Sequence, residues 1–229
     1  MNPLNLPFID LHTHLSRIEK QTVSVQNIFP GEGFAAFTGR NFYSVGLHPW
    51  HIKSQQENND LLLRVEEALE FDHVIFIGEC GLDKKVENSW DEQLRIFEAQ
   101  AFMADEFEKP LIIHCVKAYN EVIQLHKKKH PQMPWILHGY GGSIELTKQL
   151  VNNNFLFSFG ENIFNPKAKA IESFKYLPLE RIFFETDEYE GDVEKVYQQG
   201  AMLRKIKPDL LKEAVWKNFN RIENVKWIG

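Results

Sequence analysis

Eight short apolar runs recur along the chain, and they constrain its fold more than any other feature. The runs are rich in β-branched and aromatic residues, and helical patterns separate most of them. The predicted strands are Phe8–His12, Thr22–Asn27, Asn41–His48, Val74–Glu79, Leu111–His114, Trp135–His138, Phe155–Phe159 and Arg181–Asp187. The predicted helices are Asn58–Phe71, Trp90–Phe107, Ala118–His130, Ser143–Asn152, Pro166–Phe174, Val193–Ile206 and Pro208–Asn218. This alternation predicts parallel β/α units, for which a single TIM-like (β/α)8 barrel of the α/β class is the natural arrangement.

The first quarter of the chain does not fit a regular barrel. Only 26 residues separate His14 from Asn41, and they hold one predicted strand and a Pro-Gly turn. Two crossover helices do not fit there, because each crossover takes roughly 10–12 residues or more. We therefore expect the barrel to be shortened or irregular on this side. No repeat or linker interrupts the pattern, so residues 1–229 are expected to form one domain.

Bulk composition excludes some classes of protein. No apolar run approaches the roughly 20 residues of a membrane span, and the N-terminus lacks the pattern of a secretory signal. Two cysteines, Cys80 and Cys115, give no disulfide framework, so a reducing cytoplasm is the expected compartment. The net charge is −6, and the sequence shows no obvious basic face that could bind a long duplex. A nucleic-acid substrate would thus be held locally, at a few nucleotides.

Six potential metal ligands lie at the C-terminal ends of predicted strands. They are His12, His14, Glu79, His114, His138 and Asp187. Strand C-termini converge on one face of a barrel, where active sites are built. One such histidine alone is more often a hydrogen-bonded polar residue, but six independent coincidences are improbable. The set therefore indicates a metal site.

The number of ligands suits two ions better than one. The side chains of His12 and His14 point the same way because strands have a period of two. We assign His12, His14 and Asp187 to one ion, and His114 and His138 to the other, with Glu79 bridging. Such a pair could hold a hydroxide between the ions and stabilise both oxygens of an in-line displacement.

Other candidate residues remain open to more than one interpretation. Cys80 and Cys115 follow ligands directly, so each should point to the opposite strand face and serve as a structural thiol. His48 and His51 follow another strand, where lining the pocket and shaping a turn are equally good interpretations.

The order of these motifs resembles the TatD family of metal-dependent hydrolases over nearly the whole chain. The similar segments are Phe-Ile-Asp-Leu-His-Thr-His-Leu from Phe8, Gly-Leu-His-Pro from Gly46, Ile-Gly-Glu-Cys-Gly-Leu-Asp from Ile77, Pro-Leu-Ile-Ile-His-Cys from Pro110, Leu-His-Gly from Leu137, Glu-Thr-Asp from Glu185, the helix with Gln93, Phe97 and Gln100, and Asn218. The resemblance implies a TIM-like barrel with two divalent ions and a deoxyribonuclease that trims DNA from an end. It implies that Asp187 binds metal and handles the proton of the attacking water. Asp187 and Glu79 are thus the predicted catalytic residues.

Several positions depart from the family pattern. Val116 stands where the family usually has an arginine that suits phosphate. Lys84, Lys85 or Lys117 could supply a positive charge instead, and we take His48, Lys84 and Lys117 as candidate substrate-binding residues. Gly-Tyr-Gly-Gly follows His138, and an acidic segment follows Asp187, so the substrate surroundings differ from the pattern.

Three functions remain in competition. A phosphodiesterase acting on DNA or a nucleotide ester is favoured by the complete ligand set. An amidohydrolase acting on a C–N or carboxylic-ester bond shares the His-x-His and late Asp, but many such enzymes bridge their metals with a modified lysine. A metal-binding barrel without turnover is the third. The ion is open among magnesium, manganese and zinc, because imidazoles suit zinc or manganese while the resemblance implies magnesium.

Overall fold

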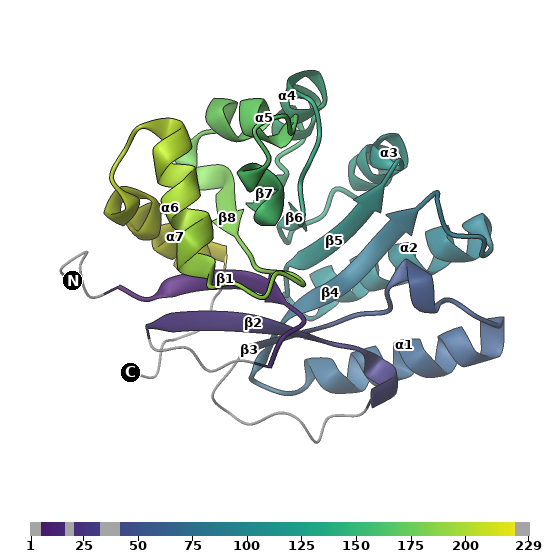
Figure 1. Ribbon diagram of the computed structural model, residues 1–229. Coiled ribbons are helices and arrows are strands. Elements are labelled where there is room, and N and C mark those ends of the chain that lie inside the picture. Colours follow the sequence, from purple (N-terminus) through teal and green to yellow (C-terminus); the bar gives the residue numbers. More distant parts are fainter. Residues whose placement is uncertain (1–5, 17–20, 33–41, 223–229) are drawn as a thin grey trace. The chain divides into compact units, whose positions relative to one another are not determined.

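The computed structural model describes residues 6–16, 21–32 and 42–222 (Figure 1). Their strands are β1 Phe8–Thr13, β2 Thr22–Ile28, β3 Phe42–Val45, β4 Val74–Asp83, β5 Leu111–Val116, β6 Trp135–Leu137, β7 Leu156–Phe159 and β8 Ile182–Phe184. The α-helices are α1 Gln55–Leu69, α2 Trp90–Glu106, α3 Tyr119–Lys129, α4 Ile144–Asn152, α5 Ala170–Tyr176, α6 Val193–Arg204 and α7 Pro208–Ile222. Short 3-10 helices are η2 Pro30–Glu32, η3 Pro49–His51, η4 Glu161–Phe164 and η5 Leu179–Arg181. Every predicted strand and helix is present.

The eight strands follow one another through a single sheet in sequence order. The pairs β3–β4, β4–β5, β5–β6 and β7–β8 are all parallel. From β3 onward, an α-helix connects each strand to the next. This strand order and these crossovers confirm the α/β class and its TIM-like (β/α)8 type.

The irregular first quarter is also confirmed. Among the described residues between β1 and β3, the one helical segment is η2, a single 3-10 turn. The first α-helix, α1, begins at Gln55, where Ser54 and Glu57 form a capping box. That cap starts the helix three residues before the predicted Asn58. Asn41, the first residue of the predicted third strand, lies outside the described residues.

By their contacts, the residues divide into two compact units, one of residues 1–25 with 138–229 and one of residues 26–137. In the first, Tyr197 of α6 joins the helix layer to β1. Its hydroxyl donates to the Ile9 carbonyl at 3.0 Å and accepts from the Ile9 amide at 3.2 Å. Its ring packs 4.4 Å from that of Phe184 in β8. These contacts fix the strand on which His12 lies.

In the unit of residues 26–137, β4 is the longest strand, and all ten of its residues are buried. Helices α1 and α2 pack on this strand (Figure 1). Our prediction ended β4 at Glu79, but pairing with β5 continues to Asp83. Gly81 explains the extension, because its φ of 144° and missing Cβ let it approach the His114 carbonyl, with which a Cβ would collide.

Candidate metal centre

The first cluster consists of His12, His14 and Asp187, within the unit of residues 1–25 and 138–229. The Asp187 amide donates to the His12 carbonyl at 2.9 Å, and the His14 amide donates to the Asp187 carbonyl at 3.1 Å. These backbone bonds place the carboxylate between the two imidazoles. Asp187 Oδ1 lies 3.7 Å from His12 Nε2 and 3.4 Å from His14 Nε2. The structure thus brings together the three residues that the sequence assigned to one ion, and their binding of a metal stays a prediction.

The donor set of the first cluster fits a divalent ion. Two imidazole nitrogens and a carboxylate oxygen lie within 4.8 Å of one another, and these are common ligands of zinc and of other divalent metals. The His12 side chain is fully buried, whereas those of His14 and Asp187 are 37% and 38% exposed. The cluster is therefore open on one side, where water or a substrate can reach it.

Asp187 depends on a buried network that the sequence did not reveal. Asp10, on β1, accepts hydrogen bonds from the Thr186 amide at 2.8 Å and hydroxyl at 2.7 Å. The Thr186 and Thr13 hydroxyls lie 2.8 Å apart. Asp187 itself has a left-handed φ of 55°, a conformation that aspartate tolerates better than most residues. Asp10 thus holds the turn that presents Asp187, and its one sequence signal is a carboxylate within an apolar strand.

His138, which follows β6, belongs to the same unit and lies beside a second buried carboxylate. Its ring is 4.6 Å from that of His12. Glu185 Oε1 lies 3.5 Å from His138 Nδ1 and accepts the Gly139 amide at 2.5 Å. Burial raises the pKa of Glu185, but contact with His138 and the charges on His138 and His12 outweigh it, leaving a lowered pKa. An ionised Glu185 at Nδ1 orients the ring and leaves Nε2 for a metal.

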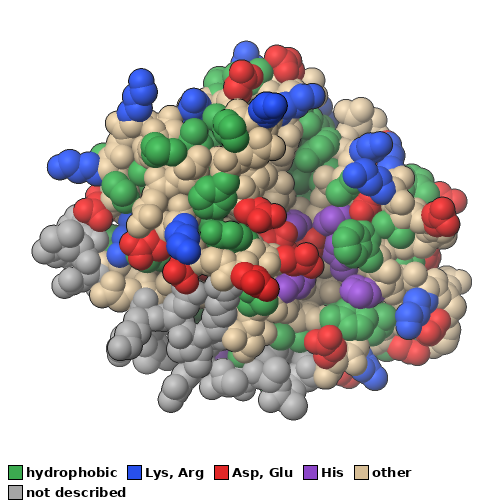
Figure 2. Space-filling model, in the orientation of Figure 1, with side chains coloured by type: hydrophobic (Ala, Val, Ile, Leu, Met, Phe, Trp, Pro, Cys, Tyr) green, Lys and Arg blue, Asp and Glu red, His purple; other side chains and the backbone are tan. Residues whose placement is uncertain are grey.

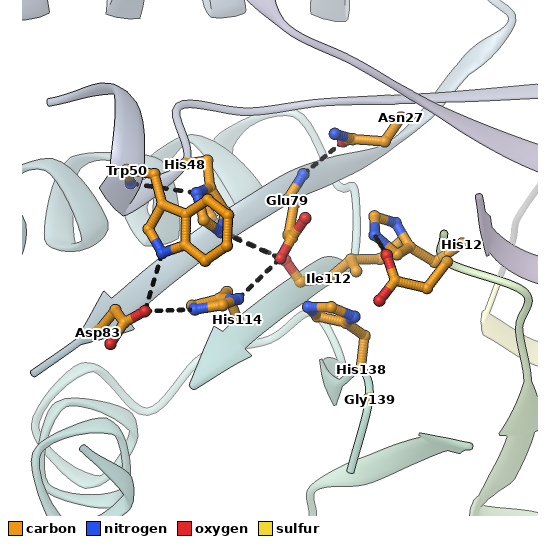
Figure 3. Close-up of polar contacts among 12 residues, drawn as sticks. His12, Asn27, His48, Trp50, Glu79, Asp83, Ile112, His114, His138 and Gly139 are labelled. Carbon is orange, nitrogen blue, oxygen red and sulfur yellow. Dashed lines mark hydrogen bonds and ion pairs between the residues drawn. The ribbon is translucent and has the colours of Figure 1, made fainter. Parts of the chain in front are cut away.

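The second cluster consists of Glu79, His114 and His48, in the unit of residues 26–137 (Figure 3). Glu79 Oε1 lies 2.9 Å from His114 Nδ1 and 3.2 Å from His48 Nε2. The Glu79 backbone is fixed by Asn27, whose Oδ1 accepts its amide at 2.6 Å. Here too the potential ligand atoms lie within 4.8 Å of one another. The Glu79 carboxylate and the His114 imidazole are donors that suit a divalent ion.

Asp83 orients His114 from its other side. Its Oδ2 lies 3.1 Å from His114 Nε2 and accepts the Trp50 indole N–H at 2.9 Å (Figure 3). Burial raises the pKa of Asp83, but hydrogen bonds from Trp50, the Lys85 amide and His114 together outweigh burial. The pKa is therefore lowered overall, and the carboxylate stays ionised. A carboxylate at one imidazole nitrogen fixes the tautomer of a metal-binding histidine. With Asp83 at Nε2, the nitrogen that His114 would offer to a metal is Nδ1, which faces Glu79.

His48 combines the two roles left open by the sequence. Its Nδ1 accepts the Trp50 amide at 3.1 Å and so caps η3. Since Nδ1 accepts, the proton of the neutral ring is on Nε2, which faces Glu79. His48 is thus a hydrogen-bond donor in this cluster rather than a free metal ligand. His51, by contrast, is exposed and stacks near Phe29, with ring centroids 4.4 Å apart.

Comparison with known proteins identifies the family. The sequence profile described as TatD related DNase matches residues 31–224. The chain belongs to the TatD-related DNase family.

Individual relatives agree with this assignment. The chain is 26% identical to an uncharacterized metal-dependent hydrolase of Haemophilus influenzae over 205 residues, covering 80% of this chain and 78% of the relative. It is 28% identical to the 3'-5' ssDNA/RNA exonuclease TatD of Citrobacter koseri over 150 residues, covering 63% and 56%. The crystal structure of the TatD homologue YjjV from Escherichia coli matches with a TM-score of 0.81 and 20% identity over 95% of this chain and 98% of that one. The chain thus has the TatD fold and belongs to a family of metal-dependent hydrolases with nuclease members.

The lysines predicted to replace the missing TatD arginine lie as follows. Lys84 Nζ pairs with Glu121 at 2.5 Å and lies 5.2 Å above the Trp90 ring. Lys117 is exposed, with a left-handed φ of 56°. Val116 ends β5 and is half-buried. Substrate binding by these lysines remains a prediction, and Lys84 would have to leave Glu121 to take part.

The two cysteines have the properties of structural thiols. Cys80 is fully buried, and its Sγ lies 3.8 Å from the Ile112 carbonyl. Burial raises the pKa of the Cys115 thiol to about 12 and that of Cys80 further. Because a metal binds the thiolate, raised pKa values disfavour both as ligands.

On the face shown in Figure 2, Lys and Arg side chains are scattered rather than gathered in one patch. This agrees with the net charge of −6. None of the described helices is long and apolar enough to cross a membrane.

Proposed function

We propose that this TatD-family chain is a two-metal-dependent phosphodiesterase, and specifically a deoxyribonuclease that digests DNA from an end. The observation that carries the proposal is the pairing of histidines with a carboxylate in each of two clusters, His12–His14–Asp187 and Glu79–His114. The relative named as a 3'-5' ssDNA/RNA exonuclease supports nucleic acid as the substrate class.

His12, His14 and Asp187 hold one ion in this proposal, and Glu79 and His114 hold another. Assignment of His138 to the second ion, with Glu79 as a shared ligand, rests on the order of strand ends in the sequence and stays a prediction. Magnesium, manganese and zinc all remain candidates, since the donors are both imidazoles and carboxylates.

Bound divalent ions supply Lewis-acid stabilisation of the phosphate and a water that is nucleophilic at neutral pH. The protein's own contribution centres on Asp187. Its partly exposed carboxylate accepts the proton of the attacking water and returns it to the leaving oxygen. The network of Asp10 and Thr186 keeps the carboxylate in place during both transfers.

Of the three proposed substrate-binding residues, His48 is the best placed, because it lies in the second cluster. Its Nε2–H, now facing Glu79, can donate to a phosphate oxygen without disturbing the cap that Nδ1 forms. Lys84 and Lys117 are assigned a weaker role as charges that attract the phosphate. With no basic patch on the face shown in Figure 2, we propose that only a few nucleotides are held.

The test uses end-labelled single-stranded DNA and bis(p-nitrophenyl) phosphate, with magnesium, manganese or zinc. We expect metal-dependent shortening of the DNA and release of nitrophenol. Asp187→Asn should lower both rates at least about 10²-fold, because it removes the proton acceptor. Circular dichroism of the variant controls for folding.

Two other results would redirect the proposal. Turnover of lactones or cyclic amides without phosphodiester cleavage would favour an amidohydrolase. Metal binding without hydrolysis of any ester or amide would leave a binding protein that has lost turnover.

A further inference from the structure

A cavity of about 210 Å³ lies beside Asp187, within the unit of residues 1–25 and 138–229. Its walls come from Gly139 after β6, Gly160 to Asn162 around the start of η4, and Glu185 to Tyr189 after β8. Pockets for drug-sized ligands hold roughly 300–1,000 Å³. This cavity therefore suits one group no larger than a nucleoside.

The cavity is lined by hydrogen-bond acceptors. Glu185 is fully buried, and its Oε2 receives no hydrogen bond from the described residues. Asn162 Oδ1 is likewise buried and without a partner, while its Nδ2 is engaged by the carbonyls of Gly139 and Tyr140. Buried acceptors of this kind favour a ligand that brings N–H or O–H donors.

The charge of the lining is of one sign. Glu161 and Glu188 are exposed, and Asp187 and Glu185 complete a set of four carboxylates, with no lysine or arginine among the lining residues. Such a lining repels a second phosphate. At about 6 Å in a water-like medium, each carboxylate disfavours a unit negative charge by about threefold.

One wall of the cavity is aromatic. The Tyr189 ring lies over Gly191, where a Cβ would collide with it. Phe164 packs against the same ring, with centroids 5.7 Å apart. A tyrosine ring held in this way offers a flat face on which a base can stack.

We propose that this cavity receives the group on one side of the scissile phosphate, the side that carries no other phosphate. This group is uncharged and has N–H or O–H donors, as a terminal nucleoside with a free hydroxyl does. The inference rests on the proposed function and names its substrate class. The protein then prefers substrates with unphosphorylated ends, and the carboxylates of Glu161 and Glu188 set this preference.

The test compares kcat/KM for a deoxyadenosine dinucleotide with free ends, with a 5'-phosphate and with a 3'-phosphate. We expect one of the two phosphorylated forms, the one whose phosphate would enter the cavity, to be cleaved about tenfold more slowly than the free-ended form. The ratio of kcat/KM for the free-ended form to kcat/KM for the slower phosphorylated form should shrink in about 0.5 M salt, where the Debye length is only a few ångströms. It should also shrink in a Glu161→Gln, Glu188→Gln double variant. Glu190→Gln is the matched control, because Glu190 is exposed on the same segment but does not line the cavity.

Equal kcat/KM values for the three dinucleotides would overturn the inference. Faster cleavage of one phosphorylated form, with no slowing of the other, would also overturn it and would indicate a cation held by the cavity carboxylates. Hydrolysis of bis(p-nitrophenyl) phosphate in the same preparations would then leave the proposed function standing. If neither that ester nor any dinucleotide is cleaved, both proposals fail.

Discussion

Two predicted metal-binding histidines each lie against a carboxylate that the sequence did not mark as functional. His138 has Glu185 at Nδ1, and His114 has Asp83 at Nε2. In both cases the carboxylate fixes which ring nitrogen is left for a metal. The six ligand candidates could be predicted from strand ends because that signal is local. Asp83, Glu185 and Asp10 could not, because each acts on a partner 31 or more residues away in the chain.

Glu185 provides a prediction at this scale. Replacing it by glutamine keeps the shape but removes the charge that orients His138, so metal affinity should fall by about tenfold or more. Metal titration of the apoprotein measures this. The unfolding midpoint of each protein is also measured with a chelator present, so that no metal is bound. An unchanged midpoint in Glu185→Gln shows that lower metal affinity comes from lost orientation of His138 and not from lost stability. Glu172→Gln, an exposed carboxylate on α5, is the control. If the metal affinity of Glu185→Gln is unchanged, Glu185 does not orient His138 for metal binding.

At the scale of elements, every strand and helix could be predicted from periodicity, whereas several boundaries could not. The segment to Asp83 continues β4 because Gly81 permits close approach to β5. Conversely, α5 begins at Ala170 rather than Pro166, since Asn165 Oδ1 accepts the Lys167 amide and stabilises a turn there. Contacts distant in sequence decide the first case, and local turn chemistry decides the second.

The link between α1 and α2 gives a pH-dependent prediction. Glu92 accepts two hydrogen bonds from Arg95, at 2.8 and 2.6 Å, and one from buried Asn58 at 2.9 Å. The Arg95 bonds are the largest cause of a Glu92 pKa lowered from 4.5 to about 2. Because the folded pKa lies below the unfolded one, this stabilisation is fully present above pH 4.5 and is lost as pH falls toward 2.

Glu92→Gln should therefore lower the free energy of unfolding by about 1 kcal/mol at pH 7, after allowance for solvent screening. The difference from the wild type should vanish toward pH 2. Urea unfolding at several pH values measures both. Glu66→Gln, on the exposed face of α1, should change stability by less than about 0.5 kcal/mol at each pH. A difference for Glu92→Gln that does not depend on pH would contradict this assignment.

At the scale of the whole molecule, the TIM-like fold and TatD membership could be predicted because the motifs span nearly the full chain in order. The expectation that residues 1–229 form one domain stays a prediction, since contacts divide the residues into two compact units. Each unit carries its own cluster of histidine and carboxylate side chains that could hold a metal ion. We propose that both clusters hold a divalent ion in the working protein.

Elemental analysis of metal-saturated protein, after removal of unbound ions, tests that claim most directly. The wild type should retain two ions per chain. Asp187→Asn, in the first cluster, and His114→Gln, in the second, should each retain one, because each weakens one cluster alone. One ion or none in the wild type, or two ions in both variants, would contradict the two-metal account.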